Sequence, residues 1–325
     1  MKREFLMLAH KYERQYVGGW LMSEKLDGMR AFWDGGISRG IQAASIPYSN
    51  IEKDNRLVNA PIATGLWSRY GKVIHAPGWW LDKLPKIPLD GELWIGHGQW
   101  EGVASCVKKH VPGPEWSGVE YRIFDVPSLW KVLEDGCISV VNFKKTLLGC
   151  TKWIQATDAS LLMPAKPFEW VYEALHESNI ENDVVVVHPQ ITLPLQQQAA
   201  REAIDEYLDR ILISKGEGVV LRAPQSVWTP ERSHNMLKYK PINDAEGIVV
   251  GYTWGLGKLL GMMGALIVEY EGKRLELSGF TNAERQMTDY ENPQFPIGSV
   301  VTFKYRELSN AGIPKEARFF RKSQE

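Results

Sequence analysis

The pattern of apolar residues and glycines changes after Pro241, and this change divides the chain into two parts with different predicted secondary structure. Before it, short apolar runs alternate with helical patterns. Ala200, Ile204 and Leu208 recur at helical spacing within residues 196–214. After Pro241, short strand-like runs are separated by glycine-rich turns, at residues 247–252, 265–270, 275–278 and 299–305. This second pattern predicts a small β-barrel of four or five strands.

Composition limits the kinds of protein that remain possible. With 325 residues, 44% hydrophobic content and 13 Trp, the chain can bury the core of one large domain and one small one. Its formal net charge of −1 excludes a polycationic protein, so any contact with nucleic acid must use local basic patches. Cys106, Cys137 and Cys150 are widely spaced, which predicts reduced core thiols and neither a zinc site nor a disulfide framework.

The sequence also makes a prediction about the compartment. No apolar run reaches the roughly 18 residues of a transmembrane helix. The apolar run near the N-terminus is shorter than the core of a signal peptide, which takes about 7–15 residues. A cytoplasmic protein without a membrane partner is therefore expected, and its first residues are expected to form the first strand or loop of the fold.

Residues 25–30, Lys-Leu-Asp-Gly-Met-Arg, follow the short apolar run at residues 20–22. A lysine ammonium with its ordinary pKa of about 10.4 is almost never a nucleophile at pH 7. Neighbouring cations and desolvation can release the amine for covalent catalysis. The segment alone also fits a polar turn with Asp27 and Gly28 at its bend, so the interpretation depends on the motifs that follow.

Four further segments place a carboxylate or a lysine pair at the edge of an apolar run. They are Asp-Gly-Glu-Leu-Trp at 90–94, Tyr-Arg-Ile-Phe-Asp at 121–125, Glu-Gly-Val-Val-Leu-Arg at 217–222 and Leu-Lys-Tyr-Lys-Pro at 237–241. In this order, the five segments resemble the motifs of the covalent nucleotidyltransferases. That superfamily comprises DNA ligases, RNA ligases and mRNA capping enzymes.

Further details are similar to the ATP-dependent DNA ligases, in particular the minimal viral and bacterial type without an N-terminal DNA-binding domain. Asp-Ala-Glu-Gly at 244–247 resembles their hinge into a second domain, and residues 312–321 resemble their basic C-terminal motif. Only 24 residues precede Lys25, too few for the cofactor-recognition domain of NAD-dependent ligases. The resemblance thus implies an α+β fold. Residues 1–241 would form a nucleotidyltransferase (ATP-grasp-like ligase) domain of antiparallel sheets and helices, and residues 242–325 an OB-fold β-barrel.

The implied reaction is the sealing of nicks in duplex DNA. The protein is expected to act as a monomer, and the resemblance to the minimal viral type would also allow it to be virus-encoded. Lys25 would attack the α-phosphorus of ATP and hold AMP as a phosphoramidate, and AMP would then pass to the 5′-phosphate of the nick. Each step moves charge onto phosphate oxygens, so Mg²⁺ or Mn²⁺ is expected. An RNA ligase or an RNA-capping nucleotidyltransferase remains the alternative, and a silent nucleic-acid-binding protein is a third reading.

The resemblance assigns roles to individual residues of this chain. Catalytic roles are implied for Lys25, Asp27, Arg30, Glu92, Glu217, Lys238 and Lys240. Contacts to the nucleotide are implied for Ser23, Glu24, Lys25, Arg30, Arg69, Glu92, Phe124, Glu217, Lys238, Lys240 and Lys315. Glu92 and Glu217 are the implied metal ligands, and the implied DNA contacts are Ser68, Arg69, Arg318 and Arg321.

Two features depart from the family pattern or leave it open. Many relatives have Glu two positions before the lysine, where this chain has Ser23 beside Glu24, so the selection of adenine is unexplained. The family's Ser-Arg pair has two candidates, at 68–69 and 38–39, and choosing 68–69 makes residues 36–65 an insertion. That insertion is expected to be either a surface loop without function or a DNA contact through Arg39, Lys53 and Arg56. The short connection 253–264 argues against a DNA-encircling clamp.

Overall fold

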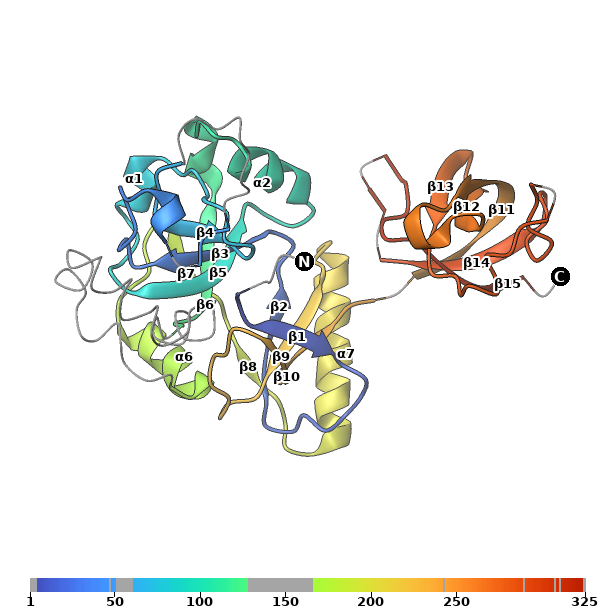
Figure 1. Ribbon diagram of the computed structural model, residues 1–325. Helices are drawn as coiled ribbons and strands as arrows, with labels where there is room; N and C mark the ends of the chain where they lie inside the picture. The colour runs from blue at the N-terminus through green and yellow to red at the C-terminus, as the bar shows by residue number, and fades with distance from the viewer. Residues whose placement is uncertain are drawn as a thin grey trace, which may run out of the picture. The chain divides into compact units, whose positions relative to one another are not determined.

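The computed structural model describes residues 5–46, 48–50, 61–127, 166–241, 243–288, 290–306, 308–309 and 311–323. Lys53, Arg56, Cys137 and Cys150 lie outside these ranges. The chain divides into two compact units, Met1–Tyr239 and Lys240–Glu325 (Figure 1). The division falls two residues before the boundary expected from the sequence.

The described strands of the first unit form two five-stranded sheets. The first sheet has the order β1-β10-β9-β2-β8, from β1 (Leu8–Lys11), β10 (Arg232–Tyr239), β9 (Gly218–Arg222), β2 (Leu21–Lys25) and β8 (Ile191–Thr192). The second has the order β4-β3-β5-β6-β7, from β4 (Leu66–Ser68), β3 (Met29–Asp34), β5 (Pro88–Trp94), β6 (Glu120–Asp125) and β7 (Val185–Val187). The expected antiparallel pairing needs a correction, because β1 pairs with β10 and β6 with β7 in parallel.

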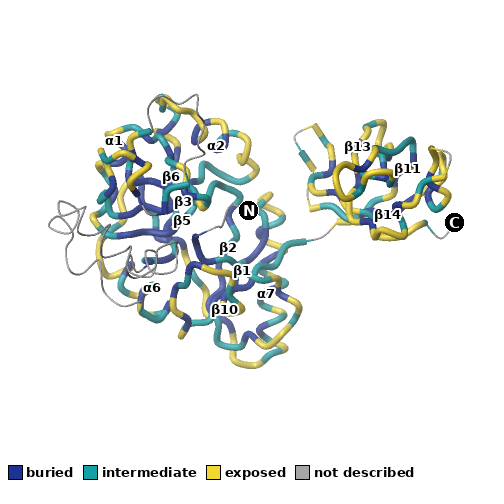
Figure 2. Tube along the Cα trace, in the orientation of Figure 1, coloured by how far each residue is buried: buried dark blue, intermediate teal, exposed yellow. Residues whose placement is uncertain are grey.

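Helix α7 (Gln197–Ile213) covers the first sheet, and it is the helix that the apolar spacing predicted. It buries Ala200, Ile204, Leu208 and Ile211 against the strands. Figure 2 shows that the chain of α7 includes both buried and exposed segments. The backbone N–H of Gly216 donates to the carbonyl oxygen of Ile211 at 2.8 Å just past the helix end. The helix is therefore held by burial of one face, as an amphipathic surface helix should be.

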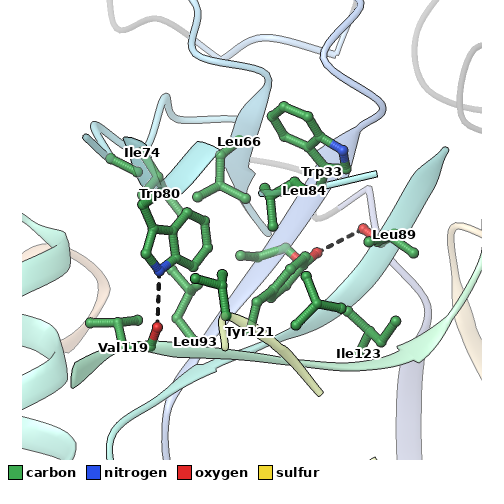
Figure 3. Packing of buried hydrophobic residues seen from close by; sticks show 14 of the residues in the cluster. Trp33, Leu66, Ile74, Trp80, Leu84, Leu89, Leu93, Val119, Tyr121 and Ile123 are labelled. Carbon is green, nitrogen blue, oxygen red and sulfur yellow. Dashed lines mark hydrogen bonds between the residues drawn. The ribbon is translucent and has the colours of Figure 1, made fainter. Parts of the chain in front are cut away.

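A tryptophan-rich core lies at the second sheet, whose neighbouring helices are α1 (Gly78–Leu81), α2 (Trp100–Val107) and α6 (Phe168–Glu177). Trp80 and Trp116 pack edge to face with ring centroids 4.9 Å apart. Figure 3 shows the hydrogen bonds of two polar side-chain groups in this core. Trp80 Nε1 donates to the carbonyl oxygen of Val119 at 2.9 Å, and Tyr121 Oη donates to the carbonyl oxygen of Leu89 at 2.9 Å. Buried Trp and Tyr side chains usually have hydrogen-bond partners of this kind. These two hydrogen bonds fix the orientation of the rings that pack on the inner face of the sheet.

The described part of residues 36–65 corrects an expectation. Of the two alternatives, the surface loop is wrong for the described residues, because Ala43, Ile46 and Tyr48 are buried together with Phe32 and Trp67. The DNA contact through Arg39, Lys53 and Arg56 stays a prediction. A 3-10 turn, Ala43–Ser45, begins this packing. The apolar residues show no regular period, so neither helix nor strand periodicity could reveal them, although they contribute to the core of the first unit.

The described strands of the second unit form a five-stranded sheet with the order β13-β12-β11-β14-β15. The strands are β11 (Asn243–Trp254), β12 (Met263–Tyr270), β13 (Lys273–Leu277), β14 (Val300–Tyr305) and β15 (Arg318–Lys322), and all adjacent pairs are antiparallel. Beyond the end of β13, Ser278 forms a single bridge to Arg318 of β15. The described strands therefore form a curled sheet whose ends touch at one bridge, and not the continuous ladder of a closed barrel.

Two smaller expectations can be compared with the structure. Cys106 is a buried thiol, as expected of a core cysteine, and burial raises its pKa to about 11. Among the described helices, none has the length and apolar character needed to cross a membrane.

Candidate active site

Lys25 is the last residue of β2, and the neighbouring strand β9 brings Glu217 to it. The strand register pairs Lys25 with Gly218, so Glu217 lies directly before the paired residue. Lys25 Nζ and Glu217 Oε2 are 2.5 Å apart, and the two side chains are 27% and 15% exposed. The two motifs that the sequence placed nearly 200 residues apart thus meet in one partly buried ion pair.

The glycine of the Lys-Leu-Asp-Gly-Met-Arg segment permits a close approach to β5. A Cβ atom at Gly28 would lie 2.8 Å from Glu92 Cγ and nearer still to the carbonyl oxygen of Leu93. Any side chain at this position would force the bend that contains Asp27 away from β5. The glycine therefore lets the segment that follows Lys25 lie against the strand that carries Glu92.

Glu92 lies among several cations. The registers of β3, β5 and β6 place Arg30 and Arg122 directly opposite Glu92, one on each side. Burial raises the pKa of Glu92 above its ordinary value, while the charges of Lys25, Arg30 and Arg69 act in the opposite direction. The structure thus brings Lys25, Arg30, Arg69 and Glu92 within electrostatic reach of one another. Sequence reasoning missed Arg122.

A buried carboxylate, Asp90, holds Arg30 in place. Arg30 Nε and Nη2 donate to the two carboxylate oxygens at 2.6 and 2.7 Å, and Trp228 Nε1 donates to Asp90 Oδ2 at 2.9 Å. The Arg30 guanidinium also lies 4.6 Å from the ring centroid of Phe124. Phe124, for which the resemblance implies a nucleotide contact, therefore lies against Arg30. Asp90 was not among the predicted site residues.

A second buried ion pair lies beside the first. Arg222 Nη2 of β9 is 3.1 Å from Asp125 Oδ2 of β6, and both side chains are less than a tenth exposed. The Arg222 guanidinium also lies over the ring of Phe168 at 4.7 Å. Because β9 and β6 belong to different sheets, this pair links the two sheets of the first unit. Asp125 follows Phe124, and Arg222 ends the Glu-Gly segment. Nothing in the sequence predicted that these two residues pair with each other.

Two histidines engage Glu24, the residue directly before Lys25. His97 Nε2 lies 2.7 Å from Glu24 Oε1, and His188 Nε2 donates to the Glu24 carbonyl oxygen at 2.8 Å. Both contacts are long-range in sequence, and neither histidine had a recognisable motif. The Glu24 side chain, which the resemblance implied as a nucleotide contact, is thus paired within the protein. Ser23 is buried on β2.

The buried His188 predicts a pH dependence of stability. Burial lowers its pKa from about 6.5 to about 4. The unfolded state therefore binds a proton between these values that the folded state does not, so stability falls as the pH drops through this window. The loss should reach about 3 kcal/mol. Urea unfolding of the wild type and of His188→Gln from pH 7 to pH 4 measures it, since glutamine cannot titrate.

Exposed His176 provides the control for this comparison. His176→Gln should follow the wild-type pH dependence. Identical pH dependence in the wild type and in His188→Gln would contradict the assignment of this loss to His188.

The predicted lysine pair is separated by the end of a strand. Lys238 of β10 and Ser23 of β2 both pair with Val220 of β9, so the three residues share one face of the first sheet. Lys240 follows the last residue of β10, which is Tyr239, and belongs to the second unit. Alternating positions in a Lys-Tyr-Lys segment would place both ammonium groups on one face of a strand, but this expectation fails for Lys240 because β10 ends before it.

Three of the predicted residues lie in the second unit. Arg318 and Arg321 are exposed on β15, and Lys315 is half-buried in the turn before that strand. Lys304 of β14 and Arg321 both lie near the exposed ring of Phe320, at 3.5 and 5.6 Å from its centroid. The strand thus presents cations around an aromatic ring.

The two Ser-Arg candidates have different surroundings. Ser38 is buried and donates to Asp34, and Arg39 forms an exposed ion pair with Asp82 at 2.6 Å. Ser68 ends β4, and Arg69 follows in the turn after it. The charge of Arg69 acts to lower the pKa of Glu92, which relates this candidate to the site.

The potential metal ligands are carboxylates. Within the described ranges, no group of three or more His, Cys, Asp or Glu side chains is arranged to hold a metal ion. Mg²⁺, however, is commonly bound by one or two carboxylates together with water and substrate phosphates. Glu92 and Glu217 fit that kind of site.

Fold and site together define a covalent-nucleotidyltransferase-like unit followed by an OB-like unit. Comparison with known proteins agrees. Residues 254–322 match the DNA ligase OB-like domain family. The chain is 28% identical over 318 residues to a DNA ligase of Haemophilus influenzae, covering 97% of this chain and 91% of the relative.

Solved structures of DNA ligases are also similar to this chain. One, from a structure-function analysis of Lig E DNA ligases described as binding DNA with a minimal scaffold, has a TM-score of 0.71 at 28% identity and covers 98% of both chains. Another, Pmar-Lig, has a TM-score of 0.61 at 18% identity, covers 98% of this chain and 67% of its own, and shows the fold alone. The predicted resemblance to the minimal DNA ligases is confirmed, and the comparisons support DNA ligase function.

Proposed function

We propose that this chain is an ATP-dependent DNA ligase that seals nicks in duplex DNA through a lysyl-AMP intermediate. The observation that carries the proposal is the meeting of Lys25 with Glu217, beside Glu92 and Arg30. A lysine amine placed among cations suits attack on a phosphate, because charge develops on the phosphate oxygens.

The first unit supplies the groups for nucleotide transfer. Lys25 forms the bond to the α-phosphorus, pyrophosphate leaves, and Glu217 is the carboxylate next to the amine before reaction. Arg30, oriented by Asp90, is placed for phosphate and ribose contacts, and Phe124 for stacking on the base. Lys238 lies on the same sheet face as Ser23 and adds positive charge.

A divalent cation, Mg²⁺ or Mn²⁺, would neutralise charge on the triphosphate when bound. Glu92 and Glu217 are the residues that we propose hold it, because their oxygens are of the type that Mg²⁺ prefers. We further propose that Arg318 and Arg321 of the second unit contact the phosphates of the duplex.

Labelled nucleotide tests the proposal directly. Protein incubated with α-labelled ATP and Mg²⁺ should form a covalent adduct, which should then disappear on addition of nicked duplex as sealed product forms. An adduct with GTP would indicate a capping enzyme, sealing confined to RNA an RNA ligase, and no adduct with either nucleotide would contradict the proposal. Excess chelator should stop every step.

Comparing Arg69 with Arg39 tests the assignment of the Ser-Arg pair. Arg69→Ala should slow single-turnover sealing about 10- to 150-fold, since a charge-assisted contact contributes roughly 1.5–3 kcal/mol. Lys25 adenylation should persist. Arg39→Ala should change sealing by no more than about two-fold, because its ion pair with Asp82 is exposed. A large defect in Arg39→Ala alone would reverse the assignment.

A further inference from the structure

Residues 36–50 contact the turn that carries Arg69. The turn follows β4 and is closed by Gly71, whose N–H donates to the Ser68 carbonyl at 2.9 Å. The Ser68 hydroxyl oxygen accepts from the N–H of Lys72 at 3.1 Å. On its other side, the N–H of Asn50 donates to the Gly71 carbonyl at 2.8 Å. The backbone of residues 36–50 therefore hydrogen-bonds to the turn itself.

The approach at Gly71 leaves no room for a side chain. A Cβ atom there would lie 2.9 Å from the backbone nitrogen of Asn50 and nearer still to the carbonyl oxygen of Tyr48. Gly71 also has a φ of +74°, a conformation that glycine adopts easily and other residues rarely. The turn and residues 48–50 thus fit against each other only because this position is glycine.

A buried carboxylate fixes residues 36–50 to the strand that precedes the turn. Asp34 Oδ2 accepts from Tyr48 Oη at 2.7 Å and from Trp67 Nε1 at 3.0 Å, and the Ser38 hydroxyl donates to the same oxygen. The Tyr48 and Trp67 rings also pack edge to face, with centroids 5.3 Å apart. Because Trp67 comes directly before Ser68, this cluster fixes the start of the turn.

We propose that residues 48–50, held by the hydrogen bond of Tyr48 to Asp34, position Arg69 for nick sealing, with Tyr48 and Gly71 as the positioning residues. The inference rests on the proposed ligase function. Arg69 contributes to the electrostatics of Glu92, so a displaced turn would move this cation relative to the reacting phosphate. A displacement of about 1 Å in such a group can cost about 100-fold in rate.

Gly71→Ala tests the proposal, with Gly40→Ala as its matched control. Gly40 lies before the residues that contact the turn and has a similar φ of +83°, but a Cβ atom there would meet nothing within 4 Å. Gly71→Ala should slow sealing of a pre-adenylated nick by about 10- to 100-fold and leave Lys25 adenylation within about two-fold. Gly40→Ala should leave both steps within about two-fold of wild type.

A double-mutant cycle separates positioning from general damage to the fold. If Gly71 acts through Arg69, Gly71→Ala should cost no more than about two-fold further in an Arg69→Ala background. Equal loss of adenylation and sealing, or multiplicative effects in the double mutant, would overturn the proposal.

Tyr48→Phe provides a second variant if Gly71→Ala fails to fold, since it keeps the ring and removes only the hydroxyl group. It should slow sealing more than adenylation, and this difference should vanish in the Arg69→Ala background; a proportional loss of both steps would again overturn the proposal. Failure of the wild type to seal nicks would instead refute the ligase function itself.

Discussion

Lys25→Ala is expected to abolish formation of the covalent nucleotide adduct, lowering its rate by several orders of magnitude. Alanine has no nucleophile, and the neighbouring lysines cannot replace an amine held at the end of β2 beside Glu217. Sealing of a nick that already carries AMP on its 5′-phosphate should survive at least in part, because that step forms no bond to lysine. Gel detection of labelled protein and single-turnover sealing measure the two steps separately.

Lys83→Ala is the control for this experiment. Lys83 pairs with Asp183 and lies outside the strands that carry the site residues. It should form the adduct at the wild-type rate. Full adduct formation by Lys25→Ala would remove Lys25 from its catalytic role.

Asp90→Ala is expected to destabilise the protein by about 3–5 kcal/mol. Removing the carboxylate leaves the largely buried guanidinium of Arg30 without its partner, and an unpaired buried charge is the costly outcome of breaking such a pair. Trp228 also loses its acceptor. Chemical unfolding at pH 7 measures the change in the free energy of unfolding.

The exposed Arg39–Asp82 pair allows a matched comparison of the same two residue types. Asp82→Ala should cost only about 0–1 kcal/mol, because that ion pair is accessible to solvent. Similar losses for the two variants would show that Arg30 and Asp90 are not held in a buried, desolvated pair.

The sequence predicted those parts of the fold that rest on local patterns. Helix α7 has one apolar face, and the strands of the second unit are bounded by glycine turns, so both follow from periodicity and turn chemistry. Pairing between distant strands does not. β1 pairs with β10 more than 200 residues away, and nothing in either segment specifies that partner or its parallel direction.

Among the candidate site residues, too, those that belong to motifs could be predicted from the sequence, and those defined by contacts across the fold could not. Motif order predicted Lys25, Glu92 and Glu217 as site residues, because a family resemblance preserves order along the chain. The partners that orient them, such as Asp90 and His97, are defined only by contacts across the fold. In the sequence, Asp90 is one of many carboxylates, and its burial and its pairing with Arg30 become visible only in the fold.

The links between the two sheets of the first unit have a consequence for the thermodynamics of binding. Asp90 of one sheet accepts from Trp228 beside the other, and Asp125 pairs with Arg222 in the same manner. Ordering these side chains is therefore part of folding. We therefore expect that little rotamer entropy remains to be lost around Arg30 and Phe124 on nucleotide binding, and that the affinity derives from preorganisation.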